Sequence, residues 1–191
     1  MISADLTGGS DVSDWGVANR INNGGYRERL WRTPTSAEWY YLFETRTTRA
    51  TGLTAPNSTN NNARFCHATV CGVPGIILFP DSYTHPESGV SIQNLNANGA
   101  YADNNILATS WTAMQAAGAV FLPACGYRDC QNDNRYRPGY GGWYSEGRYW
   151  SSTHRNQTES FYLYFAGSSH NAQAYAGRYL GQSVRLVQDI N

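Results

Sequence analysis

The chain has 191 residues, with 14 basic and 14 acidic side chains and a formal net charge of zero at pH 7. This length favours one domain with its own core, so we expect a single domain over residues 1–191. The balanced charge provides no broad attraction for phosphate backbones or anionic lipids. Nucleic-acid binding and membrane-surface binding are therefore not expected.

No segment of the sequence is long and apolar enough to span a membrane, so we expect no direct membrane insertion. The first residues, MISADL, lack the basic and apolar regions of a signal peptide. That absence does not place the protein in the cytoplasm, because a fragment of a longer surface protein has the same appearance.

The first predicted element is a short amphipathic helix over about 36–45. Thr35 and Glu38 have the spacing of a capping box, which satisfies free N–H groups at a helix start. Apolar residues follow at positions i, i+3 and i+4 and would form one buried face: Trp39, Leu42 and Phe43.

A hairpin is expected next, because strand-prone runs at 64–70 and 76–79 flank a turn-rich spacer at 71–75. The segments 54–62 and 91–105 are rich in Asn, Ser and Thr and lack periodicity. We therefore expect both to be surface loops.

A second helix is predicted to begin near Ser110 and to end at Gly118, since Gly is favoured just past a helix end. It would bury Trp111, Met114 and Ala117 on one side. The apolar run 119–123 that follows is typical of a buried strand.

The composition changes from residue 135 onward, where eight of the 14 tyrosines lie between Tyr136 and Tyr179. Alternation along 160–165 predicts a strand with Tyr162 and Tyr164 facing away from the core. We expect a polar loop at 166–177 and a last strand at 183–187. The predicted core of the whole chain is Trp39, Leu42, Phe43, Trp111, Phe121, Trp150, Phe161, Leu163, Phe165, Val184 and Leu186.

The four cysteines form two pairs with equal spacing, Cys66 with Cys71 and Cys125 with Cys130. Two disulfides would suit an exported domain, and the stretch between Cys125 and Cys130 suits a loop closed by one bridge. A four-thiolate zinc site and free buried thiols are the other two interpretations. The sequence leaves all three open.

Several motifs in one order carry a resemblance to a known family. The C-terminal ones are 147–153 (GRYWSST), the alternating 161–165 (FYLYF) and 178–187 (RYLGQSVRLV). Upstream motifs match the same group: 14–16, 22–25, 30–33, 38–39, 42–43, 45–46 and 118–123. Together they resemble the C-type lectin-fold variable proteins of diversity-generating retroelements, found among Bacteroidota surface proteins and their phages.

The resemblance implies an α+β class, with a C-type lectin-like fold of two helices and small antiparallel sheets. The C-terminal strands would display a surface that tolerates substitution. The four cysteines and the longer loop between Cys130 and Glu146 depart from the family pattern. These departures concern the local shape of the site rather than the fold.

In proteins of this kind, the retroelement rewrites adenines of a template repeat, so that Asn-type codons become codons for Tyr, Ser, His, Asp, Gly, Arg or Asn. The region at about 140–187 has that composition. Tyr, Ser, Gly and Asn also dominate antibody paratopes, where Tyr provides a large contact surface with few rotors. The expected ligand-binding residues are Tyr144, Arg148, His154, Arg155, Asn156, Tyr162, Tyr164, Ser168, His170, Asn171, Tyr175 and Tyr179. Tyr162, Tyr164, Tyr175 and Tyr179 are expected to form one contiguous solvent-exposed patch, with His154, Arg155 and His170 around them.

No motif for calcium-dependent sugar binding or for catalysis is present. The Glu-Pro-Asn, Gln-Pro-Asp and Trp-Asn-Asp tripeptides of sugar-binding C-type lectins are absent, and so are the H-E-x-x-H and G-x-S-x-G motifs. The four histidines are scattered along the chain. We therefore expect no enzymatic activity, no cofactor and no bound metal.

Three functional hypotheses remain. The first is a hypervariable binding protein at a cell surface or phage tail tip, with an unknown protein or glycan on another cell or host surface as its partner. The second is an invariant adhesive or structural module of the same fold. The third is a formylglycine-generating-type enzyme, although neither cysteine pair lies in the C-terminal region where that chemistry would be expected. The sequence does not specify the ligand or the oligomeric state.

Overall fold

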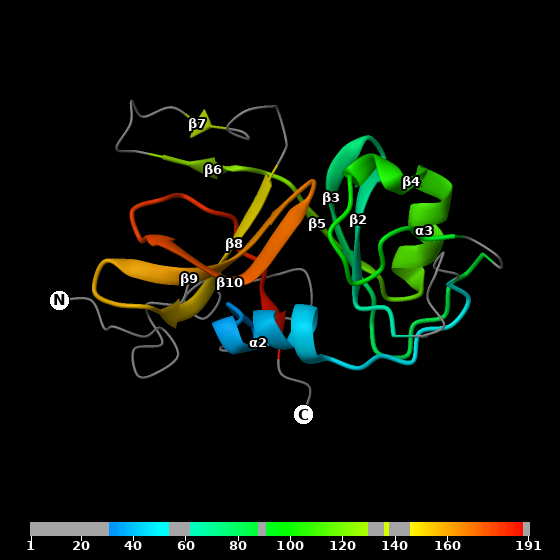
Figure 1. The fold of residues 1–191 in the computed structure, drawn as a ribbon, viewed down its shortest axis with the longest axis horizontal. Coiled ribbons are helices and arrows are strands. Elements are labelled where there is room, and N and C mark those ends of the chain that lie inside the picture. Colours follow the sequence, from blue (N-terminus) through cyan, green and yellow to red (C-terminus); the bar gives the residue numbers. More distant parts are fainter. Residues whose placement is uncertain (1–30, 54–61, 88–90, 130–135, 138–145, 189–191) are drawn as a thin grey trace.

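The computed structural model describes residues 31–53, 62–87, 91–129, 136–137 and 146–188. These residues form an α+β fold of short helices and several small sheets (Figure 1). The helical elements are α2 (Ser36–Tyr40), which continues as the π-helical turn η1 (Tyr41–Thr45), the 3-10 turn η2 (Tyr101–Asp103) and α3 (Ala108–Ala116).

The predicted helix over 36–45 is confirmed, since α2 and η1 together cover that range. The hydroxyl of Thr35 accepts a hydrogen bond from the Glu38 N–H at 3.1 Å, and Glu38 Oε2 accepts one from the Thr35 N–H at 2.8 Å. Arg32 adds two bonds to the same carboxylate, at 2.8 and 2.6 Å. The capping box thus fixes where the helix begins.

A four-stranded sheet has the order β4–β2–β3–β5, with the bounds Asn105–Ile106, Phe65–Val70, Val73–Leu78 and Val120–Pro123. The predicted hairpin and the strand that follows the second helix are confirmed. Strand β4 pairs with β2 in parallel, so the expectation of purely antiparallel sheets is wrong here.

The hairpin turn is shorter than expected. Cys71 and Gly72 have φ angles of 51° and 83° and close it as a two-residue turn, so residues 73–75 belong to β3. Two successive positive φ angles match the right-handed twist of the strands. The predicted five-residue spacer was wrong for this reason.

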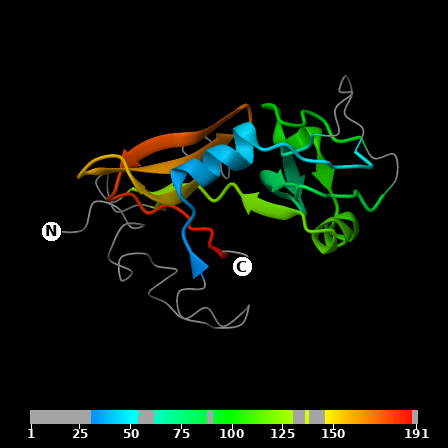
Figure 2. The same ribbon diagram turned by 90° about the horizontal axis from the view of Figure 1, so that it is seen from below.

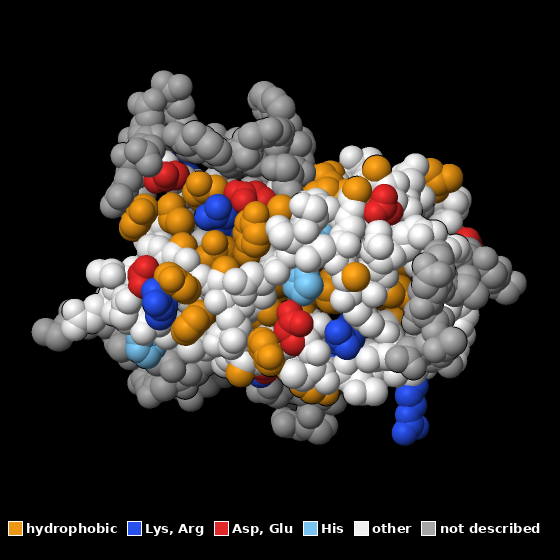
Figure 3. Space-filling model, viewed as in Figure 1, with side chains coloured by type: hydrophobic (Ala, Val, Ile, Leu, Met, Phe, Trp, Pro, Cys, Tyr) orange, Lys and Arg blue, Asp and Glu red, His pale blue; other side chains and the backbone are white. Residues whose placement is uncertain are grey.

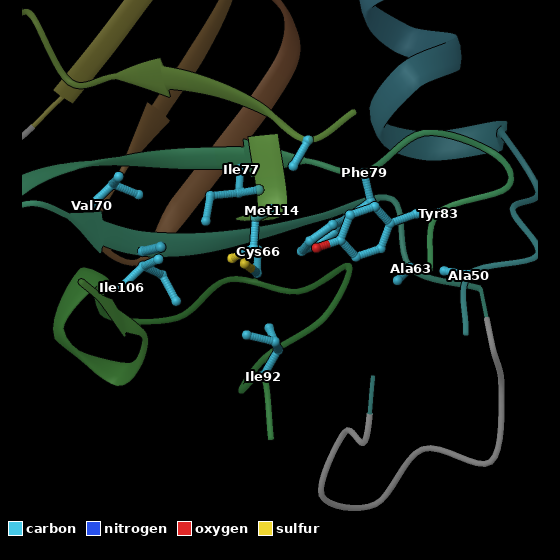
Figure 4. Packing of buried hydrophobic residues seen from close by; sticks show 12 residues of the cluster. Ala50, Ala63, Cys66, Val70, Ile77, Phe79, Tyr83, Ile92, Ile106 and Met114 are labelled. Atoms are coloured by element: carbon cyan, nitrogen blue, oxygen red, sulfur yellow. The ribbon is translucent and has the colours of Figure 1, made fainter. Parts of the chain in front are cut away.

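Both faces of this sheet are buried. Alternate residues of β2 and β3 enter two clusters: Cys66 and Ile77 pack under α3 on one side, while Phe65 and Ile76 face the C-terminal sheet on the other. Figure 4 shows the first cluster, in which Met114 of α3 lies among Cys66, Ile77 and their neighbours. Burial on both faces explains the nearly continuous apolar runs of these strands.

The second sheet has the order β10–β9–β8, with the bounds Ser169–Gly177, Glu159–Ala166 and Glu146–His154. Strand β9 contains the predicted strand at 160–165. The loop predicted at 166–177 is wrong, because β10 pairs with β9 from Ser169 opposite Ala166 to Gly177 opposite Glu159. Small and polar residues suggested a loop, yet here they fill an edge strand whose backbone is paired.

The ends of the described chain pair with each other, as Figure 2 shows. Strand β1 (Trp31–Arg32) is antiparallel to β11 (Val187–Gln188). Within the predicted strand at 183–187, only Val187 belongs to a strand, and Ser183 forms an isolated bridge with Tyr149 of β8. The rest of that predicted strand is irregular. A further two-stranded pair joins β6 (Tyr127–Arg128) to β7 (Tyr136–Arg137).

The other predicted loops are only partly described. Residues 54–61 lie outside the described part, whereas 91–105 contain η2 and the start of β4. Ile92 and Asn104 are buried, which the prediction of a surface loop did not allow. The Asn104 amide donates to the carbonyls of His67 and Gln93, at 2.7 and 3.0 Å, so its burial leaves no unpaired amide hydrogen.

Four of the predicted core residues are fully buried: Trp39, Phe43, Leu163 and Phe165. Leu42, Trp111, Phe121, Phe161 and Leu186 are partly buried. Val184 is 42% exposed, so its assignment to the core is wrong. Trp150 lies on the outer face, opposite Tyr162, because Tyr149 occupies the inner face of β8.

Cys66 and Cys71 carry free thiols. Cys66 lies in β2 and Cys71 in the turn beyond its end, five residues further along an extended chain. That span is roughly 16 Å, far beyond the approximately 7 Å that a disulfide allows between Cα atoms. Cys130 lies outside the described residues, so the second pair remains a prediction.

The substitution Leu163→Ala is expected to lower the free energy of unfolding by about 2–5 kcal/mol, since it leaves a cavity in a fully packed site. Val184→Ala removes apolar carbons from an exposed side chain and should change it by less than about 0.5 kcal/mol. Denaturant unfolding of both variants measures the difference. Equal losses would show that the register of β9 is wrong.

Stability in acid should depend on Glu38. Hydrogen bonds from Arg32, and then from Thr35, lower the pKa of this carboxyl from 4.5 to about 2. Because the folded pKa is the lower one, its stabilisation is present above about pH 4.5 and is lost as the pH falls towards about 2. Glu38→Gln should flatten the decline of the melting temperature in this window, whereas Glu87→Gln, at an exposed position, should not.

Candidate ligand-binding site

The C-terminal sheet presents two different faces. Pairing aligns Arg148 with Tyr164 and Trp150 with Tyr162 on the outer face. Tyr149, Leu163 and Phe165 point inward and belong to the buried cluster beneath the sheet. Helix α2 covers that inner face, where the Trp39 indole donates to the Trp150 carbonyl at 3.3 Å. Side chains on the outer face and at the strand ends are therefore the ones available to a ligand.

One group of the predicted residues gathers where β8, β9 and β10 end together. We call it the hairpin-end patch and define it as Arg155, Asn156, Glu159, Tyr175 and Tyr179. The Arg155 guanidinium lies 3.4 Å from the Tyr175 ring centroid and 2.8 Å from Glu159 Oε2. Asn156 Nδ2 donates to the same carboxylate oxygen at 2.6 Å. The carboxylate of Glu159 thus fixes the side chains of Arg155 and Asn156.

Tyr179 joins this patch through Gly177, which is paired with Glu159. A Cβ atom at position 177 would overlap the Tyr179 ring, so the ring packs on a backbone that only glycine leaves open. Tyr175 and Tyr179 nevertheless remain 49% and 50% exposed. They are held by contacts on one side and open to solvent on the other.

The turn that carries Arg155 is held by its own hydrogen bonds. Asn156 Oδ1 accepts from the backbone N–H groups of Thr158 and Glu159, each at 2.9 Å, in the manner of an Asx turn. The Arg155 N–H donates to the Glu159 carbonyl at 2.9 Å. The aromatic and charged groups of the patch therefore stand on a fixed backbone.

A second group lies on the outer face of β8 and β9 and on β6. We call it the Arg148 cluster and define it as Tyr127, Arg148, Trp150, Tyr162 and Tyr164. The guanidinium of Arg148 lies 3.7 Å from the Tyr127 ring centroid, with Tyr162 and Tyr164 at 5.6 and 5.9 Å. Glu146 pairs with it at 3.3 Å. Figure 3 shows hydrophobic side chains surrounding an arginine over this sheet.

The single patch expected from the sequence is divided in the structure. Tyr162 is only 7% exposed, because the Trp150 ring meets it edge-on and Arg148 lies over it. Tyr175 pairs with Phe161 and therefore lies on the inner side of the sheet, away from Tyr162. The prediction that four tyrosines form one solvent-exposed patch was wrong.

His170 is the clearest correction among the predicted site residues. It pairs with Phe165, faces inward, and packs 4.8 Å from the Phe65 ring and 5.9 Å from that of Phe43. Its Nδ1 lies 2.6 Å from Asn98 Oδ1 and its Nε2 lies 3.1 Å from Glu44 Oε1. His170 therefore connects three segments of the framework rather than facing a ligand.

Nearby, His67 of β2 is buried at the contact between the two sheets. Burial lowers its pKa, and the neighbouring His170 lowers it further, while carbonyls of Ala97 and Ser169 oppose the shift. Tyr101 packs against the His67 ring, with a centroid distance of 5.6 Å. This pair of histidines contributes to packing between the sheets.

The other predicted site residues lie apart from these groups. His154 ends β8 and is partly buried, Ser168 lies in the turn between β9 and β10, and Asn171 is exposed beside an irregularity in β10. Asn171 Oδ1 accepts from the Gln173 N–H at 2.9 Å, which supports the irregular backbone. Tyr144 lies outside the described residues.

Sequence reasoning missed Tyr127, Trp150 and Glu159. The alternation of GRYWSST could have placed Trp150 outward beside Arg148, by the rule applied to β9. Glu159 lies four residues after Arg155 and its role depends on the turn between β8 and β9. Tyr127 comes from a distant segment, and no local signal links it to Arg148.

The described residues contain neither a candidate membrane span nor a candidate metal-binding cluster. None of the helices found there is long and apolar enough to cross a bilayer. In the same parts of the chain, no group of three or more His, Cys, Asp or Glu side chains is arranged to hold a metal ion.

The fold and the site define an α+β protein with arginine–tyrosine stacks on its C-terminal sheet. Residues 85–187, more than half of the chain, match the family model of a domain of unknown function, DUF8237. The chain belongs to this family. No curated protein and no solved structure matched it.

His170→Ala is expected to lower the free energy of unfolding by about 1–3 kcal/mol, because it leaves Glu44 and Asn98 without this partner and opens space against Phe65. Gln173→Ala, an exposed position on the same strand, serves as the control and should cost less than about 0.5 kcal/mol. Chemical denaturation measures both. If His170→Ala were as mild as the control, the contacts of His170 with Glu44, Asn98 and Phe65 would not stabilise the fold.

Proposed function

We propose that this protein is a non-enzymatic ligand-binding protein that contacts its ligand through the hairpin-end patch, with the Arg148 cluster as a second, separate surface. The observation that carries the proposal is the pair of half-exposed tyrosines, Tyr175 and Tyr179, each held by a specific contact. Aromatic side chains fixed before binding lose little conformational entropy on association, and such residues dominate binding energy at interfaces.

Charge and polarity also suit this role. Arg155 and Glu159 are partly exposed, with side chains 39% and 29% accessible, and Asn156 is exposed beside them. An exposed ion pair of this kind contributes little to stability, typically about 0–1 kcal/mol. Its value to a binding surface is geometric, since it presents donors and acceptors next to two rings. Protein and glycan partners both offer matching groups.

We further propose that the fold is C-type lectin-like and that a retroelement diversifies the region at about 140–187. The motif GRYWSST lies within β8, and the alternating FYLYF lies within β9. Gly147, Leu163 and Phe165 are buried, whereas Arg155 and Tyr175 are exposed. This separation supports a framework that is spared and a surface that is allowed to vary. The protein would act at a cell surface or a phage tail tip.

One observation favours the invariant adhesive module as the second candidate. Tyr162 and His170 have residue types that the proposed diversification would produce, yet they are buried or tied to the framework. Free variation at these two positions would disturb the packing of Tyr162 against Trp150 and of His170 against Phe65. An invariant surface would not be limited in this way, because Tyr162 and His170 would keep their identities.

The binding proposal predicts that the double substitution Tyr175→Ser and Tyr179→Ser abolishes binding to the ligand selected from an array of glycans and cell-surface proteins. The melting temperature should change by only a few degrees, because both rings are half-exposed. The matched control is Tyr40→Ser with Tyr41→Ser, two exposed tyrosines on the helical segment. Binding that survives the first pair but not the second would contradict the assignment of the site.

The neighbouring DNA distinguishes the two candidates. A nearby repeat that differs from the codons of 140–187 only at adenines, together with a reverse transcriptase gene, is expected if the surface is diversified. Substituted codons should include those of Arg155, Asn156, Tyr175 and Tyr179. A repeat that differs as often at the codons of the buried Leu163 and Phe165 as at those of the exposed residues would contradict the proposal. A genome without any such repeat would favour the invariant adhesive module.

A further inference from the structure

A cavity of about 270 Å³ lies between α2, strands β3 and β5 and the C-terminal segment, and none of its lining residues belongs to the hairpin-end patch or to the Arg148 cluster. In Figure 2 the blue α2, the yellow-green β5 and the red C-terminal segment lie near one another at the centre of the view. Most of its wall is apolar and comes from Trp39, Leu42, Leu78, Val120, Leu122 and Leu186. A second cavity, of about 350 Å³, shares Gly118, Val120 and Arg185 with the first.

The two arginines of the first cavity differ in how they are neutralised. Arg46 is only 6% exposed, and its charge is paired with Asp81, whose Oδ1 lies 3.1 Å from Nη1, while Nη2 donates to the Arg64 carbonyl at 3.2 Å. Arg185 is exposed at the shared rim, and its guanidinium makes no ion pair or hydrogen bond with another described residue. Neither Asp nor Glu is among the described residues that line the two cavities.

From this arrangement we propose that the cavity binds a small apolar monocarboxylate, with the hydrocarbon body against the apolar wall and the carboxylate paired with Arg185. The charge of Arg185 has no counterpart in the described wall, so an anion is the complementary ligand. An engineered cavity of about 150 Å³ holds benzene, and this one is larger, so a medium-length alkyl chain is a suitable body.

The experiment uses three probes with the same alkyl chain, namely octanoate, octanol and octylammonium, titrated into the whole protein by calorimetry below the concentration at which they form micelles. The dissociation constant of octanoate should be at least about fivefold lower than that of octanol. A ratio of this size matches the free energy that one partly exposed ion pair contributes. Octylammonium should bind more weakly than octanol. Octanoate that binds no better than octanol would overturn the proposal.

Two variants locate the site. Arg185→Gln should remove the preference for octanoate and leave octanol binding unchanged, whereas Arg178→Gln, outside both cavities, should alter neither. Leu186→Trp should weaken binding of octanoate and octanol alike by filling the cavity. Octanoate binding that is insensitive to both Arg185→Gln and Leu186→Trp would place the ligand elsewhere and overturn the proposal. Loss of binding in the Tyr175 and Tyr179 double variant would also contradict it, because the hairpin-end patch is a separate surface.

Discussion

The register of the C-terminal sheet is the constraint on which the remaining features depend. Leu163 and Phe165 fill the space between this sheet and Phe65 of β2, so β9 cannot shift by one residue without exposing them. That register sends Tyr162 and Tyr164 outward. It also turns His170, opposite Phe165, towards the core. The distinction between the framework and the proposed binding surface therefore follows from side-chain packing beneath the sheet, and residue type alone does not determine it.

Much of the fold was predictable from local sequence signals, and the errors have identifiable physical causes. The capping box predicted the start of α2, and period-two alternation predicted β9. Strand β10 was missed because its small and polar residues lack a hydrophobic alternation, and its stability comes from pairing with β9. For the candidate site, sequence reasoning identified Arg155, Asn156, Tyr175 and Tyr179. It could not reveal which of them share a face, because an irregularity between Asn171 and Ala174 changes the pairing.

Arginine stacking is a common feature of both surface groups. Arg148 lies over Tyr127, and Arg155 lies over Tyr175. All 14 basic residues of the chain are arginines, and a planar guanidinium can stack on a ring while its edge still bonds a carboxylate. Glu146 and Glu159 supply those carboxylates. In each group the ring, cation and anion hold one another, which limits side-chain motion before any ligand arrives.

The match to the family covers residues 85–187, yet the buried cluster beneath the C-terminal sheet draws on residues that precede this range. Trp39, Phe43, Phe65 and Ile76 belong to that cluster, and Glu44 is a hydrogen-bond partner of His170. Without them, the inner face of β9 and β10 would be open to water, which would lower the stability of the fold by about 25 cal/mol per Å² of apolar area exposed. The proposed binding residues within the matched range thus depend for their positions on a framework that begins upstream of it.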